Sequence, residues 1–366
     1  MKQQDYLGDA IELLCALIST PRVSRLESNA ADIMEQRMKN YGFAPQREGN
    51  NLWIQADGYN DKKPTLLLNA HIDTVKPSAS WTRDPFEPSI EGDFIYGLGS
   101  NDCGGGLTTL LQTFRYLALR PQPYNLIYLA SSEEEVSGKD GISRALPLLP
   151  KIDVAIVGEP TGMQPAIAEK GLMVLDVIAH GKSGHAARNE GVNAIYEALD
   201  DMRWIRDYKF SKSSPFLGPT KMTLTVVHAG TQHNVIPDTC QMLVDVRTNE
   251  YYTNEEVYEI INRHVKSEVR AHSFRLHSSH IDIHHPLISR CINMGMKPYG
   301  SPTLSDQALM PFASFKLGPG ESSRSHSADE FIKISEMRHA FDTYIGLLDG
   351  KEISNEQTKK RAPTPK

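Results

Sequence analysis

The fold is decided by three apolar runs of the chain, TLLLNA at 65–70, NLIYLAS at 125–131 and IDVAIV at 152–157. Each run has the length of a strand, and continuous apolar character is typical of strands buried on both faces. Helical patterns lie around and between them, at 5–19, 28–41, 104–119 and 141–149, and a further short strand is predicted at 51–56. Buried strands that alternate with helices indicate an α/β fold whose mixed sheet has helices on both faces.

The hydrophobic pattern changes near residue 168. Apolar and polar residues then alternate, as in strands with one face in water, at 171–180, 221–230, 239–246 and 273–283. Helices are predicted between these strands at 192–208 and 253–271, and after them at 286–294 and 335–348. We therefore predict a smaller α+β domain at 169–282, inserted into a larger domain formed by 1–168 and 283–354. The polar segment 355–366 contains two prolines and is predicted to be a disordered tail.

Composition excludes several classes of protein. The 366 residues carry 39 Lys+Arg and 45 Asp+Glu, a net charge of −6, which argues against a nucleic-acid binder that depends on a basic surface. No uncharged apolar run approaches the roughly 18 residues of a membrane span, so we expect no membrane association. The four cysteines lie far apart without a CxxC motif, which indicates a reducing cytoplasm rather than a disulfide scaffold.

Acidic and histidine residues follow the buried strands. His71 ends the run at 65–70, the triplet 133–135 (EEE) follows the run at 125–131, and Glu159 follows the run at 152–157. Asp102 lies in a glycine-rich loop before a helix. Because loops beyond the carboxyl ends of parallel strands converge, we expect these side chains to meet. Their number and chemistry suit two divalent cations bridged by a carboxylate. Asp73, two residues after His71, is placed to accept the second ring N–H of His71.

Each of these signals taken alone has an ordinary explanation. Acids favour the start of a helix, as 133–135 would provide. Asp102 suits an N-cap, and Glu159 before a proline suits a turn. The joint placement at strand ends is what favours a metal site. Cys103 is predicted to be a small filler rather than a nucleophile, and the histidines near the domain boundary are predicted to be solvated: His277, His280, His284 and His285.

Seven motifs occur in the order found in the M20 family of zinc aminoacylases and peptidases, which the chain resembles from about residue 5 to 350. They are LLLNAHIDTV (66–75), GLGSNDCGGG (97–106), SSEEEVSG (131–138), VGEPT (157–161), GKSGHAA (181–187), GTQHNVIPDTC (230–240) and GPGESSRSHSADEF (318–331). The resemblance implies a zinc-peptidase-type sheet with an inserted lid domain that commonly dimerises. It implies two Zn²⁺ ions, with Co²⁺ or Mn²⁺ as substitutes, and a homodimer formed through the lid.

The resemblance also assigns roles to individual residues. His71 and Glu159 correspond to ligands of one metal, Glu135 and His326 to ligands of the second, and Asp102 to the carboxylate that bridges them. Asp73 corresponds to the partner of His71, Glu134 to the general base, and His185 to a lid histidine that stabilises the oxyanion. Asn234, Arg247 and Gly320 correspond to substrate-binding positions. The family triplet usually begins with Asp, so a register shifted by one would make Glu133 the base.

The predicted function is metal-dependent hydrolysis of an N-acyl amino acid by a cytoplasmic amidohydrolase. The GEPT motif and the late GPG-H-DE pattern most resemble the acetylornithine deacetylase subgroup. This resemblance implies activity on N-acetyl- or N-succinyl-ornithine or citrulline, in arginine biosynthesis. A dipeptidase or carboxypeptidase is the alternative within the family. The alternative from another functional class is a metal-dependent binding or regulatory relative that has lost catalysis, which the joint presence of Asp73, Glu134 and His185 disfavours.

Overall fold

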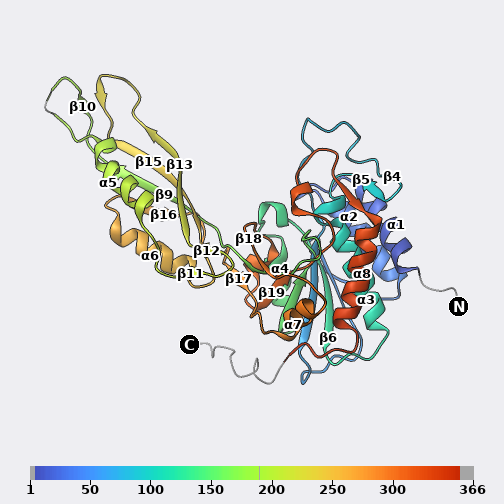
Figure 1. The fold of residues 1–366 in the computed structure, drawn as a ribbon. Helices are drawn as coiled ribbons and strands as arrows, with labels where there is room; N and C mark the ends of the chain where they lie inside the picture. The colour runs from blue at the N-terminus through green and yellow to red at the C-terminus, as the bar shows by residue number, and fades with distance from the viewer. Residues whose placement is uncertain (1–4, 189, 355–366) are drawn as a thin grey trace. The chain divides into compact units, whose positions relative to one another are not determined.

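The computed structural model describes residues 5–188 and 190–354 (Figure 1). The chain divides into two compact units. The first comprises the residues up to Ile167, Ile281–Tyr299 and the chain from Ser305 onward, and the second comprises Ala168–His280 and Gly300–Leu304. The second unit thus occupies nearly the stretch predicted for the inserted domain and also includes 300–304, which the sequence did not assign to it. The predicted tail at 355–366 lies outside the described residues.

The first unit is built on a mixed sheet with the strand order β1-β2-β6-β3-β7-β19-β8. Strands β6, β3, β7 and β19 run parallel, and β1, β2 and β8 are antiparallel to their neighbours. Two short strands, β17 and β18, pair with β8. The bounds of these strands are β1 (Gln46–Glu48), β2 (Asn51–Gln55), β3 (Thr65–His71), β6 (Asn125–Ser131), β7 (Val154–Val157), β8 (Ala166–Glu169), β17 (Ser279–His280), β18 (Tyr299–Ser301) and β19 (Ala313–Lys316).

Helices cover both faces of this sheet, as predicted. On one face α3 lies against β3 and β6 and is flanked by α1 and α8 (Figure 1). On the other face α4 packs on Leu67, Ile127 and Leu129. The helices are α1 (Tyr6–Ile18), α2 (Ser28–Asn40), α3 (Gly105–Ala118), α4 (Ile142–Ala145), α7 (Pro286–Asn293) and α8 (Ile334–Leu348). A separate three-stranded sheet is formed by β4 (Ser89–Glu91), β5 (Phe94–Tyr96) and β20 (Phe331–Lys333).

The continuous apolar runs are buried on both faces. All seven residues of β3 and all seven of β6 are buried. Successive side chains of a strand point to opposite faces, so Leu67 reaches the core under α4 while its two neighbours face α3. Tyr128 donates its hydroxyl to the Leu107 carbonyl of α3 at 2.9 Å, which satisfies its one polar group inside the core.

The second unit is an antiparallel sheet, β13-β15-β9-β16, with α5 and α6 packed on it. Burial alternates along β9 and β15, which confirms the half-buried strands expected here. The main elements are β9 (Met173–His180), α5 (Ala194–Asp207), β13 (Lys221–Ala229), β15 (Thr239–Arg247), α6 (Asn254–His264) and β16 (Glu268–Ala271). Two small antiparallel sheets pair β10 (Gly184–His185) with β14 (Val235–Ile236), and β11 (Ser213–Ser214) with β12 (Gly218–Pro219).

Two predicted elements of this unit are wrong. The helix predicted at 253–271 ends at His264, because the Asp201 carboxylate accepts the amides of Lys266 and Ser267 and turns the chain into β16. The strand predicted at 273–283 is reduced to β17. The Asn254 side chain donates to the carbonyls of Phe274 and Leu276, and Leu276 keeps only an isolated bridge to Leu172.

Candidate metal centre

The predicted ligands of the first unit lie at one edge of its sheet. His71 is the last residue of β3, Glu134 and Glu135 begin the short turn after β6, and Glu159 follows β7 by two residues. His326 lies in the loop after β19, and Asp102 in the loop that precedes α3. Because β6, β3, β7 and β19 are adjacent and parallel, their carboxyl ends bring these loops together.

Asp102 occupies the middle of the cluster. Its Oδ1 lies 3.3 Å from Nε2 of His71, and its Oδ2 lies 3.6 Å from Nε2 of His326. His71 Nε2 is also 3.6 Å from Oε1 of Glu159, and His326 Nε2 is 2.8 Å from Oε2 of Glu135. The two oxygens of one carboxylate therefore face two histidines, each accompanied by a glutamate.

The donor set fits divalent cations. Ligand atoms of His71, Asp102 and Glu135 all lie within 4.8 Å of one another. Oε1 of Glu159 is buried and makes no hydrogen bond with the described residues, although a buried carboxylate oxygen is costly without a partner. Imidazole nitrogens and carboxylate oxygens are ligands suited to zinc, cobalt and manganese.

Burial, neighbouring charges and hydrogen bonds shift the pKa values of several groups in the cluster. Burial, followed by the charge of Asp102, raises the pKa of Glu159 to about 8. Burial likewise raises the pKa of Glu134 well above its ordinary range, with Glu159 adding to the shift. The hydrogen bond to Glu135 raises the pKa of His326 to about 9. Bound cations would offset the cost of burying these carboxylates as anions and the repulsion between them.

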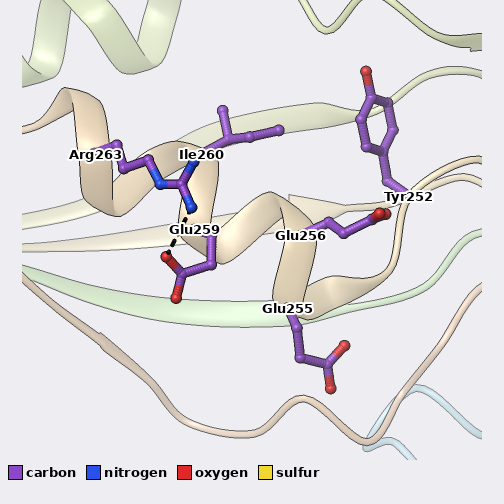
Figure 2. A pocket seen from close by; sticks show the side chains of 6 residues that line it. All are labelled: Tyr252, Glu255, Glu256, Glu259, Ile260 and Arg263. Carbon is purple, nitrogen blue, oxygen red and sulfur yellow. Dashed lines mark ion pairs between the residues drawn. The ribbon is translucent and has the colours of Figure 1, made fainter. Parts of the chain in front are cut away.

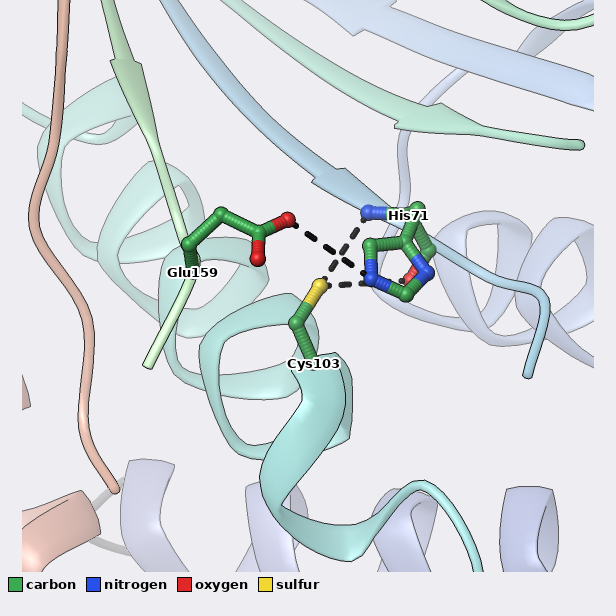
Figure 3. A group of neighbouring side chains, drawn as sticks. All are labelled: His71, Cys103 and Glu159. Carbon is green, nitrogen blue, oxygen red and sulfur yellow. Dashed lines mark hydrogen bonds and ion pairs between the residues drawn. The ribbon is translucent and has the colours of Figure 1, made fainter. Parts of the chain in front are cut away.

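Cys103 lies beside His71 in the same pocket. Figure 3 shows its sulfur and the Glu159 carboxylate both directed toward His71. The sulfur accepts the backbone amide of His71 at 3.3 Å, and burial raises the pKa of the thiol to about 12. A protonated, fully buried thiol has no nucleophilic role at neutral pH, in keeping with the prediction that Cys103 is a filler.

Asp73 supports two groups of the cluster. Its backbone carbonyl is the nearer acceptor for Nδ1 of His71, at 2.9 Å, while its carboxylate Oδ1 lies 3.6 Å away. The carboxylate accepts the backbone amides of Glu134 and Glu135, at 3.1 and 3.3 Å, and the hydroxyl of Ser24 at 2.6 Å. Asp73 therefore orients His71 and also fixes the turn that bears the two glutamates.

Glu133 and Glu134 point to different surroundings. Glu134 Oε2 lies 3.9 Å from Nε2 of His71. Glu133 has a positive φ of 53° and directs its carboxylate toward Gly138 and Arg25, whose Nε is 4.0 Å away. Of the two, Glu134 is the residue that faces the predicted metal ligands.

The remaining predicted site residues fall in different places. Gly320 belongs to the first unit, where its φ of 83° favours glycine and its carbonyl accepts the amide of Gly162 at 2.7 Å. His185 and Asn234 are exposed neighbours at the β10–β14 strand pair of the second unit. Arg247 ends β15, at the opposite end from Thr239, and is paired with Asp245 at 2.9 Å. The structure thus brings His185 and Asn234 together and keeps Arg247 apart from them.

Sequence reasoning missed two residues and misjudged one. Arg22 and Glu330 are buried and hold the loop of Asp102 through its backbone; Glu330 was quoted only as part of the last motif. His285, predicted to be solvated, is buried at the N-terminus of α7, where its Nδ1 accepts the amide of Leu287. Burial lowers the pKa of His285 to about 4.

A shallow pocket in the second unit contains none of the predicted site residues. It is formed largely by α6 (Figure 2), and the residues that line it are Tyr252, Glu255, Glu256, Glu259, Ile260 and Arg263. Two of its acids already have structural roles, since Glu256 closes the capping box of α6 and Glu259 lies 3.8 Å from Arg263.

Comparison with known proteins agrees with this geometry. The model of peptidase family M20/M25/M40 matches residues 67–350. Acetylornithine deacetylase of Shigella sonnei is 29% identical and aligns over 94% of this chain and 98% of its own length. Succinyl-diaminopimelate desuccinylase of Stenotrophomonas maltophilia is 25% identical, with coverages of 94% and 99%.

The fold is also found among solved structures. Bacillus subtilis YXEP, described as a dinuclear metal-binding peptidase of the M20 family, superposes with a TM-score of 0.73 at 16% identity, over 95% of this chain and 100% of its own. Since the family model covers most of the chain and the predicted ligands converge, this protein is a metallohydrolase of peptidase family M20/M25/M40.

Proposed function

We propose that the chain is a two-zinc amidohydrolase that releases an amino acid from its N-acyl derivative. The observation that carries this proposal is the placement of Asp102, whose two carboxylate oxygens face His71 and His326 separately. We assign one metal to His71, Asp102 and Glu159, and the other to Asp102, Glu135 and His326. Co²⁺ and Mn²⁺ suit the same ligands.

Cations held there would supply the Lewis acidity that activates a water and polarises an amide carbonyl. Glu134 is the general base in our assignment, because its carboxylate faces the ligands and lies in a buried turn. It takes the proton of the attacking water and returns it to the leaving amine as the C–N bond breaks. Burial holds the pKa of Glu134 above that of an exposed glutamate, which favours a group that must both accept and release a proton.

His185 is assigned to the oxyanion. Its Nδ1 accepts the backbone amide of Ala187 at 3.1 Å, so in the neutral ring the proton resides on Nε2, which can donate. The ring is exposed on the second unit. A donor aimed at charge that develops in the transition state accelerates acyl transfer.

We further propose that the second unit is a lid that forms a homodimer, through which His185 serves the partner's site. Apolar side chains are exposed along one stretch of this unit: Val192 is 44%, Tyr196 69% and Leu199 40% exposed. Strand β13 is an edge of its sheet, with Val227 exposed. An apolar patch beside an open strand edge is suited to association with a second copy.

The substrate proposal rests on the relatives and on the charge of the predicted binding residues. Arg247, Asn234 and Gly320 are the proposed substrate-binding positions, and the positive charge of Arg247 suits the carboxylate of an N-acyl amino acid. The relatives act, by name, on acetylornithine and succinyl-diaminopimelate. N-acetyl- or N-succinyl-ornithine or citrulline is the proposed substrate class, and arginine biosynthesis the proposed setting. A cytoplasmic location is proposed because all four cysteines are free thiols.

The test combines metal analysis with a substrate panel. Protein purified without chelator should contain close to two equivalents of metal, and chelation should abolish turnover. The panel should include N-acetyl- and N-succinyl-ornithine, citrulline and diaminopimelate, with dipeptides as the competing class. Faster cleavage of dipeptides would indicate that the protein is a peptidase rather than a deacylase. Metal binding without turnover of any substrate would indicate a non-catalytic relative.

A further inference from the structure

Arg22 is a buried arginine that joins two loops of the metal centre. It follows the Thr20-Pro21 stop of α1 and is 2% exposed. Its Nη1 donates to the carbonyl of Ile72 at 2.5 Å, and its Nη2 donates to the carbonyl of Gly99 at 2.9 Å. Its backbone is fixed as well, because the amide of Thr74 donates to the Arg22 carbonyl at 2.9 Å.

The two carbonyls belong to the segments that carry His71 and Asp102. Ile72 follows His71 directly, and Gly99 precedes Asp102 by three residues. Gly99 permits the close approach, since a Cβ at that position would lie 2.6 Å from Nη2 of Arg22. Its φ of 72° also favours glycine. The guanidinium thus fixes the distance between a histidine ligand and the proposed bridging carboxylate.

Glu330 holds the same loop through its amides. Its Oε2 accepts the amide of Gly99, and its Oε1 accepts the amides of Asn101 and Asp102, each at 2.8 Å. Glu330 is 2% exposed and follows His326 by four residues. It therefore connects the segment of the second histidine to the loop of Asp102.

We propose that Arg22 and Glu330 are positioning residues that together hold the Asp102 carboxylate between the two metal sites, an inference that rests on the proposed function. Within the described residues, their hydrogen bonds go to backbone groups and not to the side chain of a proposed ligand. Arg22 donates to a carbonyl of the loop that bears Asp102, and Glu330 accepts amides of the same loop. Together these hydrogen bonds restrict the conformation of the loop backbone. A displacement of the Asp102 carboxylate by a fraction of an ångström would move its two oxygens away from one proposed metal site or the other.

The test compares Arg22→Met and Glu330→Gln with Arg290→Met as the matched control. Arg290 also donates two guanidinium bonds to a backbone carbonyl, that of Glu352, at 2.9 Å each, but belongs to α7. The readouts are Tm, cobalt affinity and absorption spectrum, and kcat with KM. We expect the two site variants to lose about 10- to 100-fold in cobalt affinity or kcat, with an altered cobalt spectrum and KM changed less than about threefold. Arg290→Met should lower Tm only.

Arg22→Lys keeps the test decisive where Arg22→Met does not fold. Lysine retains the buried charge but lacks the planar fork that reaches two carbonyls at once. Arg22→Lys should fold, and its kcat and cobalt spectrum should lie between those of the wild type and those expected for Arg22→Met. Unchanged cobalt affinity, spectrum and kcat in folded Arg22→Lys and Glu330→Gln would overturn the inference. A wild type that binds no metal or hydrolyses no amide would instead refute the proposed function.

Discussion

The metal-free protein should become less stable as the pH rises from 5.5 to 7.5. Glu159 carries this prediction, because burial and the charge of Asp102 raise its pKa from the ordinary 4.5 to about 8. A carboxyl group whose pKa is higher in the folded state binds more protons there than in the unfolded chain. Its contribution to stability is therefore fully present below about pH 4.5 and is lost as the pH rises through about 8.

The size of the effect follows from the same shift. Each pH unit within this window costs about 1.4 kcal/mol per group, so Glu159 alone lowers the free energy of unfolding by roughly 3 kcal/mol between pH 5.5 and 7.5. His326 acts with the same sign, since its raised pKa of about 9 gives stability that is present below about 6.5 and lost above it. Its ring is half exposed, so solvent screens its share.

Urea unfolding of chelator-treated protein at pH 5.5, 6.5 and 7.5 measures this dependence, with fluorescence of the buried Trp53 as a probe of the first unit. Glu159→Gln is the control, because its amide does not titrate, and the slope should become shallower in it. Zinc should stabilise the wild type more at pH 7.5 than at 5.5, since it binds the ionised ligands. A metal-free stability that is constant or rises across this range would refute the reasoning.

Two further predictions concern catalysis. Glu134→Gln should lower kcat by at least about 10²-fold while two metals stay bound, because the glutamine amide cannot take a proton. The control, Glu133→Gln, should retain activity. If Glu133→Gln is the inactive variant instead, the base is Glu133. His185→Ala should lower kcat by roughly 10²- to 10³-fold with little change in KM. Mixing His185→Ala with Glu134→Gln subunits should restore up to about half of the wild-type rate per dimer, and absence of recovery after verified subunit exchange would mean that His185 serves its own chain.

The apolar runs were sufficient to predict three of the four parallel strands, β3, β6 and β7, because burial on both faces leaves a signal that does not depend on distant residues. Strand β19, which lies between β7 and β8, was missed, since its four residues end in a lysine and resemble a loop. The end of α6 was missed for a related reason. The helix ends where the Asp201 carboxylate accepts the amides of residues 266 and 267. Asp201 lies 63 residues before His264 in the sequence, so the residues near 264 give no sign of this end.

The metal ligands and the groups that hold them differ in how well a sequence can reveal them. A ligand must be a particular residue type at the end of a strand, so His71 and Glu159 could be named from position and chemistry. The supporting groups act on the backbone: Asp73 takes the amides of 134 and 135, Glu330 those of 99, 101 and 102, and Arg22 the carbonyls of 72 and 99. Almost every residue has a backbone amide and carbonyl. The sequence therefore does not indicate which backbone groups these side chains bind. The roles of the three glutamates at 133–135 could not be separated from the sequence for the same reason. Their side chains are identical, and they differ only through the turn that Asp73 fixes and the positive φ of Glu133.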